Sequence, residues 1–459
     1  MPKNDLSDTI VALSTPPGVG AIGVIRLSGT DAVAIVNKLF KGKNLVQQPS
    51  HTIHLGKMSF NNEVLDEVLV SLFIEPQSYT KENVVEISCH GSPYIQQKIM
   101  EALLNSGARA AQPGEFTMRA FLNGRFDLSQ AEAVADIIAS DSQASHKIAM
   151  QQMRGGISTK LKELRADLVD FTALIELELD FGEEDVEFAD RTKLFELLYQ
   201  IQEEIKLLQQ SFRYGNAIKN GIPVAIIGKP NAGKSTLLNA LLNEERAIVS
   251  SIAGTTRDTI EETITIDGYL FRFIDTAGIR EAGDEIERMG IQRSMEKIAQ
   301  ANIVIHVLDY QQANQYDDVL ALEASIRQKN PTIKIITVIN KIDLSGNRDE
   351  FPKRETDIAI SAREHYHLDT LKKELVDYVN SLKQDKQDVI ITNIRHVEAL
   401  NNAHQAIEQV IEKLQQHIPT DLISQDIKTA LRHLGNITGD IDVDKDILAT
   451  IFGKFCIGK

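Results

Sequence analysis

An eight-residue run fits the phosphate-binding pattern G-x-x-x-x-G-K-[ST] and follows an apolar strand: Gly228-Lys229-Pro230-Asn231-Ala232-Gly233-Lys234-Ser235. Its glycines let backbone N–H groups curl around phosphate oxygens, and the helix expected to start there adds a positive field. Lys234 would bridge the β- and γ-phosphates, and Ser235 would ligate magnesium (Mg²⁺). The residues expected to contact nucleotide in this run are Asn231, Ala232, Gly233, Lys234, Ser235 and Thr236.

Three further motifs follow in the order that a GTP-binding protein needs, each after an apolar strand. The first, Asp275-Thr276-Ala277-Gly278, would hold Mg²⁺ through water and meet the γ-phosphate. The second, Asn340-Lys341-Ile342-Asp343, would read guanine, because a carboxylate at Asp343 accepts from guanine N1–H and the exocyclic amine. The third, Ser361-Ala362-Arg363, would support the base. Because a doubly wound sheet binds ligands at the carboxyl ends of its strands, the motifs together predict a GTP site.

A first switch segment is expected between the first two strands of this region, at Gly254-Thr255-Thr256-Arg257-Asp258. Thr256 is our choice for the second Mg²⁺ ligand beside Ser235, and the adjacent Thr255 is the alternative. The residues expected to contact nucleotide here are Ser250, Ser251, Ile252, Ala253, Gly254, Thr255 and Thr256.

The hydrolytic step lacks one familiar group. Ile279 stands where Ras-type GTPases carry a water-orienting glutamine, and a hydrocarbon side chain cannot orient water. Asn231 could instead hold a potassium ion (K⁺) beside the phosphates, although a plain turn residue would also suit this position. Backbone carbonyls of the switch loop would complete the K⁺ shell, at Ser250, Ile252 and Thr255.

Glu287 could orient the attacking water indirectly, or it could be an exposed helix carboxylate. The candidate catalytic residues are therefore Glu287, Asn231 and Thr256.

Four stretches of different texture carry these motifs. Residues 1–123 mix short strands and turns and predict an α+β domain, whereas residues 124–220 show helical spacing, with Ser129 as an expected helix N-cap. In residues 221–382, strands alternate with helices, which predicts a P-loop GTPase domain with a mostly parallel, doubly wound sheet. Residues 383–459 are helical again, so this α/β unit is inserted in a helical domain. Its expected strands are Val224–Ile227, Thr263–Ile266, Phe271–Ile274, Ile303–Leu308, Ile333–Ile339 and Ile358–Ile360.

Composition narrows the class of protein. The chain has 459 residues, 42% hydrophobic and 25% charged, which excludes low-complexity and wholly disordered classes. Its only cysteines, Cys89 and Cys456, exclude a disulfide framework and favour a cytoplasmic location. The sequence contains no uninterrupted run of about 18 apolar residues, so no transmembrane helix is expected.

Acidic residues are concentrated in one part of the chain. The net charge of −16 argues against a broad nonspecific nucleic-acid surface. Residues 124–220 hold 18 acids and 11 bases, and 176–190 hold eight acids and no base. The acidic stretch is either a solvated linker or a docking surface for a basic partner.

The whole chain resembles the MnmE (TrmE) family of tRNA-modification GTPases. The resemblance is carried by Asp8-Thr9-Ile10-Val11-Ala12 with Thr15-Pro16-Pro17-Gly18, by Pro113-Gly114-Glu115-Phe116-Thr117 through Arg119-Ala120-Phe121-Leu122-Asn123, by the 254–258 switch segment, and by Phe455-Cys456-Ile457-Gly458-Lys459. The outer motifs are not shared by GTPases in general.

The resemblance implies that the N-terminal domain forms a homodimer and binds a one-carbon folate such as 5-formyl-tetrahydrofolate. The folate contacts that it implies are Arg26, Glu82, Arg125 and Lys459, and family members commonly have lysine where Arg125 stands. Cys456 matches the family's C-terminal cysteine in position. Its role is left open among a nucleophile, part of the folate-pocket wall and a structural thiol. The K⁺ site at Asn231 and the role of Glu287 are also implied.

The resemblance also implies a partner and a reaction. The partner is the FAD- and NADH-using MnmG protein, in a heterotetramer that installs a carboxymethylaminomethyl-type group at C5 of wobble uridine in tRNA.

Two other functions would suit the nucleotide motifs. A GTP-dependent switch in RNA or ribosome assembly would usually carry a basic KH-like segment after the G domain, and none is seen. The second alternative function is a non-catalytic GTP-binding scaffold. Ile279 favours it, because this side chain cannot orient a water for hydrolysis.

Overall fold

The computed structural model describes residues 8–180, 191–245, 262–274, 301–312, 316–345, 354–383, 389–416, 418, 420–439 and 458. They belong to two compact units. Unit 1 comprises residues 1–138, 150–202 and 398–459, and unit 2 comprises residues 139–149 and 203–397. Within the described residues, no helix is long and apolar enough to cross a membrane.

The N-terminal part of unit 1 is built on a seven-stranded sheet in the order β3-β4-β5-β6-β2-β1-β7. All neighbouring strands run antiparallel except β1 and β7, which are parallel. The strands are β1 (Ile10–Leu13), β2 (Ile22–Ser28), β3 (Phe40–Lys41), β4 (Thr52–Phe60), β5 (Glu63–Phe73), β6 (Val84–His90) and β7 (Arg109–Ala110).

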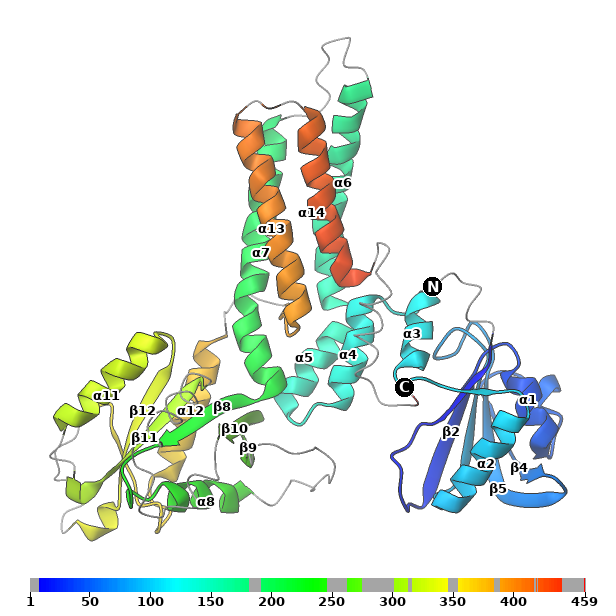
Figure 1. Cartoon of the computed structure of the whole chain (residues 1–459), viewed down its shortest axis with the longest axis horizontal. Coiled ribbons are helices and arrows are strands. Elements are labelled where there is room, and N and C mark those ends of the chain that lie inside the picture. Colours follow the sequence, from blue (N-terminus) through cyan, green and yellow to red (C-terminus); the bar gives the residue numbers. More distant parts are fainter. Residues whose placement is uncertain are drawn as a thin grey trace. The chain divides into compact units, whose positions relative to one another are not determined.

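One face of this sheet is covered by α1 (Ala32–Leu39) and α2 (Pro93–Asn105) (Figure 1). Ile35 and Ile99 from the two helices share one buried cluster with Ile25, Val70 and Ile87 of the strands. Because strand side chains alternate between faces, the residues between these buried ones lie on the opposite face. There Leu55 pairs with Leu69, and both stay exposed, at 65% and 45%.

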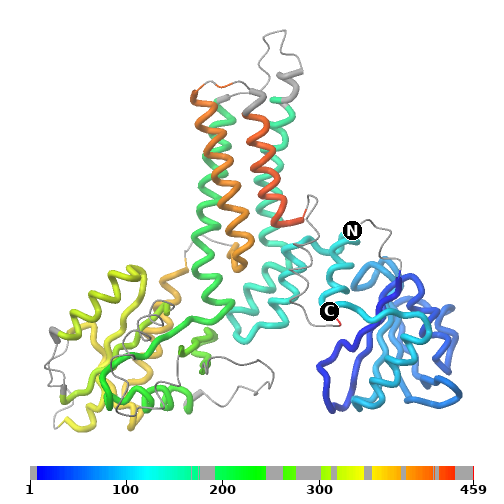
Figure 2. Tube along the Cα trace, viewed as in Figure 1, coloured from blue at the N-terminus to red at the C-terminus, as the bar shows by residue number. Residues whose placement is uncertain are grey.

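Helices make up most of the remaining described residues of unit 1, and the chain continues from them into unit 2. Buried leucine and isoleucine side chains at helical spacing line their inner faces, and α14 packs along α6 (Figure 2). The 3-10 turn η2 (Leu45–Gln47) and the helices are α3 (Glu115–Leu122), α4 (Leu128–Ile138), α5 (Gln143–Met153), α6 (Gly156–Asp180), α7 (Arg191–Asn220), α13 (Ile394–Gln415) and α14 (Thr420–Thr438).

The expectation that Ser129 caps a helix is wrong. Helix α4 begins at Leu128, and the carboxylate of Asp127 accepts from the backbone N–H of Gln130 at 2.9 Å. The Ser129 hydroxyl also donates to this carboxylate, at 2.8 Å. Asp127 is the better cap because its full negative charge also meets the positive end of the helix.

Unit 2 contains a six-stranded sheet in the order β13-β12-β11-β8-β10-β9. Only β9 runs antiparallel to its neighbour, so the predicted doubly wound α/β fold is confirmed. The strands are β8 (Ile222–Ile227), β9 (Glu262–Ile266), β10 (Tyr269–Ile274), β11 (Ile303–Asp309), β12 (Lys334–Asn340) and β13 (Ile358–Ala359).

Helices lie on both faces of this sheet. Val224 of β8 belongs to a buried cluster with Leu237 and Leu371, whereas the next residue, Ala225, belongs to a cluster with Ile326. The first cluster therefore joins one face to α8 (Lys234–Glu245) and α12 (Leu368–Ser381), and the second joins the other face to α11 (Tyr316–Lys329). Two 3-10 turns, η3 (Tyr310–Gln312) and η4 (Ile342–Leu344), follow β11 and β12.

Candidate functional site

The phosphate loop joins the end of β8 to the start of α8, at the carboxyl edge of the sheet. Gly228 and Gly233 have φ angles of 150° and 95°, and a Cβ on Gly233 would collide with the side-chain amide of Asn340. Asn231 has the left-handed φ of 63°. The loop needs both glycines, because a larger residue would strain the backbone and would collide with the carbonyl oxygen of Val307 at Gly228 or with Asn340 at Gly233.

Lys234 lies inside this loop. Its Nζ donates to the carbonyl oxygens of Gly228 at 2.8 Å and Lys229 at 3.0 Å. Burial lowers the pKa of the Lys234 ammonium, since desolvation disfavours its charge. An anionic phosphate would stabilise that charge better than two neutral carbonyls do. Ser235 is half-buried one residue later, and Thr236 is exposed.

Asn340, at the end of β12, ties the phosphate loop to the loop after β13. Its Nδ2 donates to the carbonyl oxygen of Ala232 at 3.0 Å, and its Oδ1 accepts from the N–H of Ala362 at 3.0 Å. The side chain of Asn340 is buried, so both ends of its amide are used within the protein.

The residues expected to read guanine lie together beside Asn340. The Ser361 hydroxyl donates to Oδ1 of Asp343 at 2.7 Å, which orients the carboxylate. Lys341 has a left-handed φ of 67°, and its Nζ lies 2.7 Å from Oδ2 of Asp309. Ile342 is buried beneath this turn. The residues predicted at the end of β12 and after β13 are thus brought together. Arg363, which follows Ala362 in the chain, is exposed.

Asp309 was missed in the sequence. It lies at the end of β11, in register with Asn340 of β12. A polar residue directly after a buried parallel strand is the same signal that marks Asn340, and it could have identified Asp309. Its role is to hold Lys341 in place.

Several predicted residues lie outside the described part of the chain. They are Ser250, Ser251, Ile252, Ala253, Gly254, Thr255 and Thr256 of the first switch, Asp275, Thr276, Ala277 and Gly278, Glu287, and Cys456 and Lys459 at the C-terminus. Among the described residues, no three His, Cys, Asp or Glu side chains cluster as a metal site. Ser235 and Asn231, the described candidates for Mg²⁺ and K⁺, are oxygen donors of the type that such hard cations take beside phosphate.

A second group of predicted residues lies in unit 1. The Arg26 guanidinium pairs with Oε1 of Glu86, through Nη2 at 2.7 Å and Nε at 2.9 Å. Its carbon atom Cζ lies 5.2 Å from the ring centre of Tyr79 and 5.8 Å from that of Phe116. Arg26 is therefore held between a carboxylate and aromatic rings.

Arg125 reaches the same tyrosine from the turn that follows α3. Its Cζ lies 5.1 Å from the Tyr79 ring centre and 5.0 Å from that of Phe126, and its Nη1 donates to the carbonyl oxygen of Ser78. Tyr79 thus brings together Arg26 and Arg125, which are 99 positions apart in the chain. No periodic signal marked Tyr79, which stands in a polar loop.

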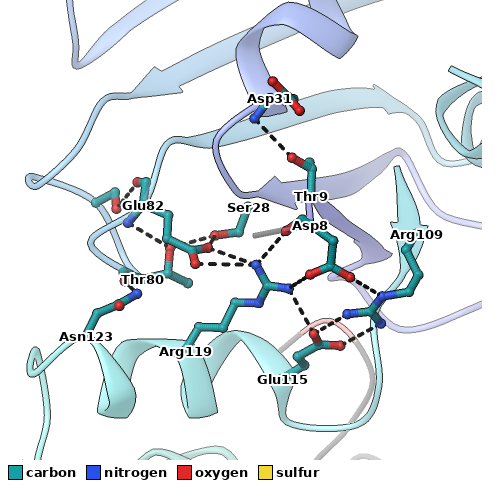
Figure 3. Close-up of polar contacts among 11 residues, drawn as sticks. Asp8, Thr9, Ser28, Asp31, Thr80, Glu82, Arg109, Glu115, Arg119 and Asn123 are labelled. Atoms are coloured by element: carbon teal, nitrogen blue, oxygen red, sulfur yellow. Dashed lines mark hydrogen bonds and ion pairs between the residues drawn. The ribbon is translucent and has the colours of Figure 1, made fainter. Parts of the chain in front are cut away.

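Glu82, the third predicted contact, belongs to a charge network centred on the buried Arg119 (Figure 3). The Ser28 hydroxyl donates to Oε2 of Glu82 at 2.6 Å, and Nη1 of Arg119 lies 3.3 Å from the same oxygen. Arg119 is fully buried and also pairs through Nη2 with Asp8 at 2.6 Å and Glu115 at 3.1 Å. Arg119 therefore fixes the Glu82 carboxylate from the protein side.

Arg109 completes the network at its outer edge. It binds Glu115 at 2.6 Å and also binds Asp8. Burial by itself would raise the pKa of Asp8 and of Glu115, but hydrogen bonds from Arg109 and the charge of Arg119 outweigh it. Each carboxyl pKa is therefore held below its ordinary value, and the pair stays ionised.

The C-terminal backbone meets this unit at the end of β1. The Ser14 hydroxyl donates to the carbonyl oxygen of Gly458 at 3.1 Å. Gly458 has a φ of 97°, and a Cβ there would collide with the carbonyl oxygen of Leu13. The register of β1 and β2 pairs Ala12 with Arg26, so Gly458, at the end of β1, lies near the strand that carries Arg26.

Comparisons with known proteins cover both units. A family profile described as the MnmE helical domain matches residues 128–456, and one described as the GTP-binding protein TrmE N-terminus matches residues 9–125. The chain is similar to tRNA modification GTPase MnmE of Cytophaga hutchinsonii, at 52% identity over 99% of this chain and 98% of that protein. The proteins of the same name from Flavobacterium johnsoniae and Bacteroides thetaiotaomicron are 53% and 51% identical, each over 98% of this chain and 99% of the relative.

Proposed function

The chain belongs to the MnmE family of tRNA modification GTPases, and from this premise we propose that it uses GTP hydrolysis to modify C5 of wobble uridine in tRNA. The observation that carries the nucleotide part is the link made by Asn340, which joins the phosphate loop to the loop after β13 that contains Ser361, Ala362 and Arg363. Backbone N–H groups and Lys234 would bind the phosphates, and Asp343, oriented by Ser361, would accept from guanine.

We propose that K⁺ supplies positive charge for hydrolysis, held by Asn231 with Ser250, Ile252 and Thr255. Ser235 and Thr256 would hold Mg²⁺, and Glu287 would orient water. The support for the K⁺ role is that Ile279 cannot orient water and that Asn231 lies within the phosphate loop. Hydrolysis measured at equal ionic strength in KCl and NaCl tests it, and equal slow rates in both salts would refute it.

The second site is proposed to bind a one-carbon folate such as 5-formyl-tetrahydrofolate. Arg26 and Arg125 suit the carboxylates of its glutamate tail, and Glu82 suits donors on its pterin ring. Lys459 would join them from the C-terminus, as the contact between Ser14 and Gly458 allows. Calorimetry with 5-formyl-tetrahydrofolate tests the site, since Arg26→Ala is expected to abolish binding.

We also propose a homodimer that works with the FAD-dependent MnmG partner in the cytoplasm. An exposed apolar pair supports the dimer, because Leu55 and Leu69 pair across neighbouring strands on the sheet face away from α1 and α2. The partner should supply much of the basic surface for tRNA, since this chain carries a net charge of −16. Sedimentation of the chain alone and with the partner would measure both assemblies.

The reaction itself is tested in cells that lack this protein. Mass analysis of their tRNA should show wobble uridines without the C5 group, and the wild-type chain should restore it. Asp343→Asn should fail to restore it, because an amide places an N–H donor where guanine also donates. Normal wobble uridines in the deletion strain would refute the proposed reaction.

A further inference from the structure

We propose that Tyr79 is a positioning residue, which holds Arg26 and Arg125 ready for a ligand that carries two carboxylates. This inference rests on the proposed folate site, since a folate glutamate tail is such a ligand. Both guanidinium carbons lie about 5 Å from the Tyr79 ring centre, at 5.2 Å and 5.1 Å. The two groups are therefore no farther apart than about twice that distance.

Two like charges this close repel each other, and the described residues compensate only one of them with a carboxylate. Arg26 pairs with Glu86, whereas the described residues give Arg125 no carboxylate partner. The electron-rich faces of aromatic rings attract cations, so the Tyr79 ring offsets part of the repulsion for both arginines. Without that ring, Arg125, which is exposed, would lose one of the two rings that hold it.

Tyr79 is itself well fixed. Its hydroxyl shares a 2.8 Å hydrogen bond with Oγ1 of Thr117, a buried residue of α3. Its ring also packs edge to face with Phe126, with ring centres 5.9 Å apart. A half-buried ring held from two sides can restrain flexible side chains without contacting the ligand.

Both arginines keep donors for a ligand. Arg26 uses Nε and Nη2 on Glu86, and within the described residues its Nη1 makes no hydrogen bond. Arg125 uses Nη1 on Ser78, and the described part of the chain offers no acceptor to its Nε and Nη2. A guanidinium binds carboxylate through such in-plane N–H groups, so the pair can receive two carboxylates.

The test is the Kd of the full-length protein for 5-formyl-tetrahydrofolate, measured by calorimetry. Tyr79→Met removes the ring but fills similar space, and it should weaken binding about tenfold. Tyr79→Phe keeps the ring and loses only the hydroxyl, so its Kd should stay close to that of the wild type. Thr117→Val removes the hydroxyl's partner and should likewise bind normally, because in both variants the ring still packs against Phe126. Unchanged Tm and GTP hydrolysis would show that each variant is folded.

A double-mutant cycle separates positioning from direct contact. If Tyr79 acts through the arginines, Tyr79→Met should raise the Kd much less in the Arg125→Ala variant than it does in the wild type. A full additional loss would mean that Tyr79 acts independently of Arg125, and it would overturn the inference. So would Tyr79→Met binding as the wild type does, or Tyr79→Phe losing as much as Tyr79→Met. Failure of the wild type to bind would instead refute the folate site itself.

Discussion

Asn340 donates a 3.0 Å hydrogen bond to the carbonyl oxygen of Ala232, across 108 positions of the chain. The phosphate loop is therefore braced by the same side chain that supports the loop after β13 at Ala362. The two loops are therefore coupled through one buried amide.

Replacing that amide should weaken nucleotide binding. Asn340→Ala leaves the Ala232 carbonyl and the Ala362 N–H without their partner, which should cost about 2 kcal/mol, roughly thirtyfold in the Kd for GDP. Fluorescence titration with labelled GDP measures the change. Asn330→Ala is the control, because within the described residues the Asn330 side chain accepts hydrogen bonds only from Thr332 in the same turn. Equal affinities for both variants would contradict the bracing role.

Asp309→Asn should speed nucleotide release. Lys341 would lose its ion pair with Asp309, a partly exposed contact, so a rise of about threefold in the GDP dissociation rate is expected. Stopped-flow displacement measures this rate. Glu374→Gln is the matched control, because it breaks an ion pair of the same length, 2.7 Å between Glu374 and Lys334, away from the nucleotide loops. If the two variants release GDP equally fast, Asp309 does not position Lys341.

Asn231→Gly should abolish the response to K⁺ while preserving nucleotide affinity. Glycine adopts the left-handed φ of 63° without strain, so this change removes only the side chain. The ratio of hydrolysis rates in KCl and NaCl is expected to fall close to one. A variant that keeps the wild-type ratio would exclude Asn231 as a K⁺ ligand, and the Kd for GDP is the accompanying control.

The buried charge network should make unit 1 sensitive to acid. The folded-state pKa of Glu115 lies below its ordinary 4.5, so its ionised form adds stability above that value, which is lost as pH falls through the folded-state pKa. At pH 7, Glu115→Gln should cost about 3 kcal/mol of unfolding free energy.

Pulsed hydrogen exchange of β2 and β6 peptides in urea would follow this unit alone. The gap in unfolding free energy between the wild type and Glu115→Gln should shrink as the pH drops below 4.5. Glu101→Gln, which removes only an exposed pair with Lys98, should show little gap at any pH. A constant gap for Glu115→Gln would mean that its ionisation is not what stabilises the unit.

The sequence alone indicated the local parts of the nucleotide site. The phosphate loop, the strands before it and the motifs at Asn340 and Ser361 depend on neighbours within a few residues, through φ preferences and helix N-termini. One local prediction was wrong, because Asp127 competes with Ser129 for the same helix end. The doubly wound sheet followed from the alternation of strands and helices.

Only the tertiary structure brought together partners that are distant in the chain. Tyr79 meets Arg26 and Arg125, and Arg119 meets Asp8 and Glu82, across loops whose spacing carries no periodic signal. The resemblance to a family suggested Arg26, Glu82 and Arg125 singly, but not what holds them. The reason is physical: a buried charge must find partners wherever packing places them, and packing is settled by the whole fold.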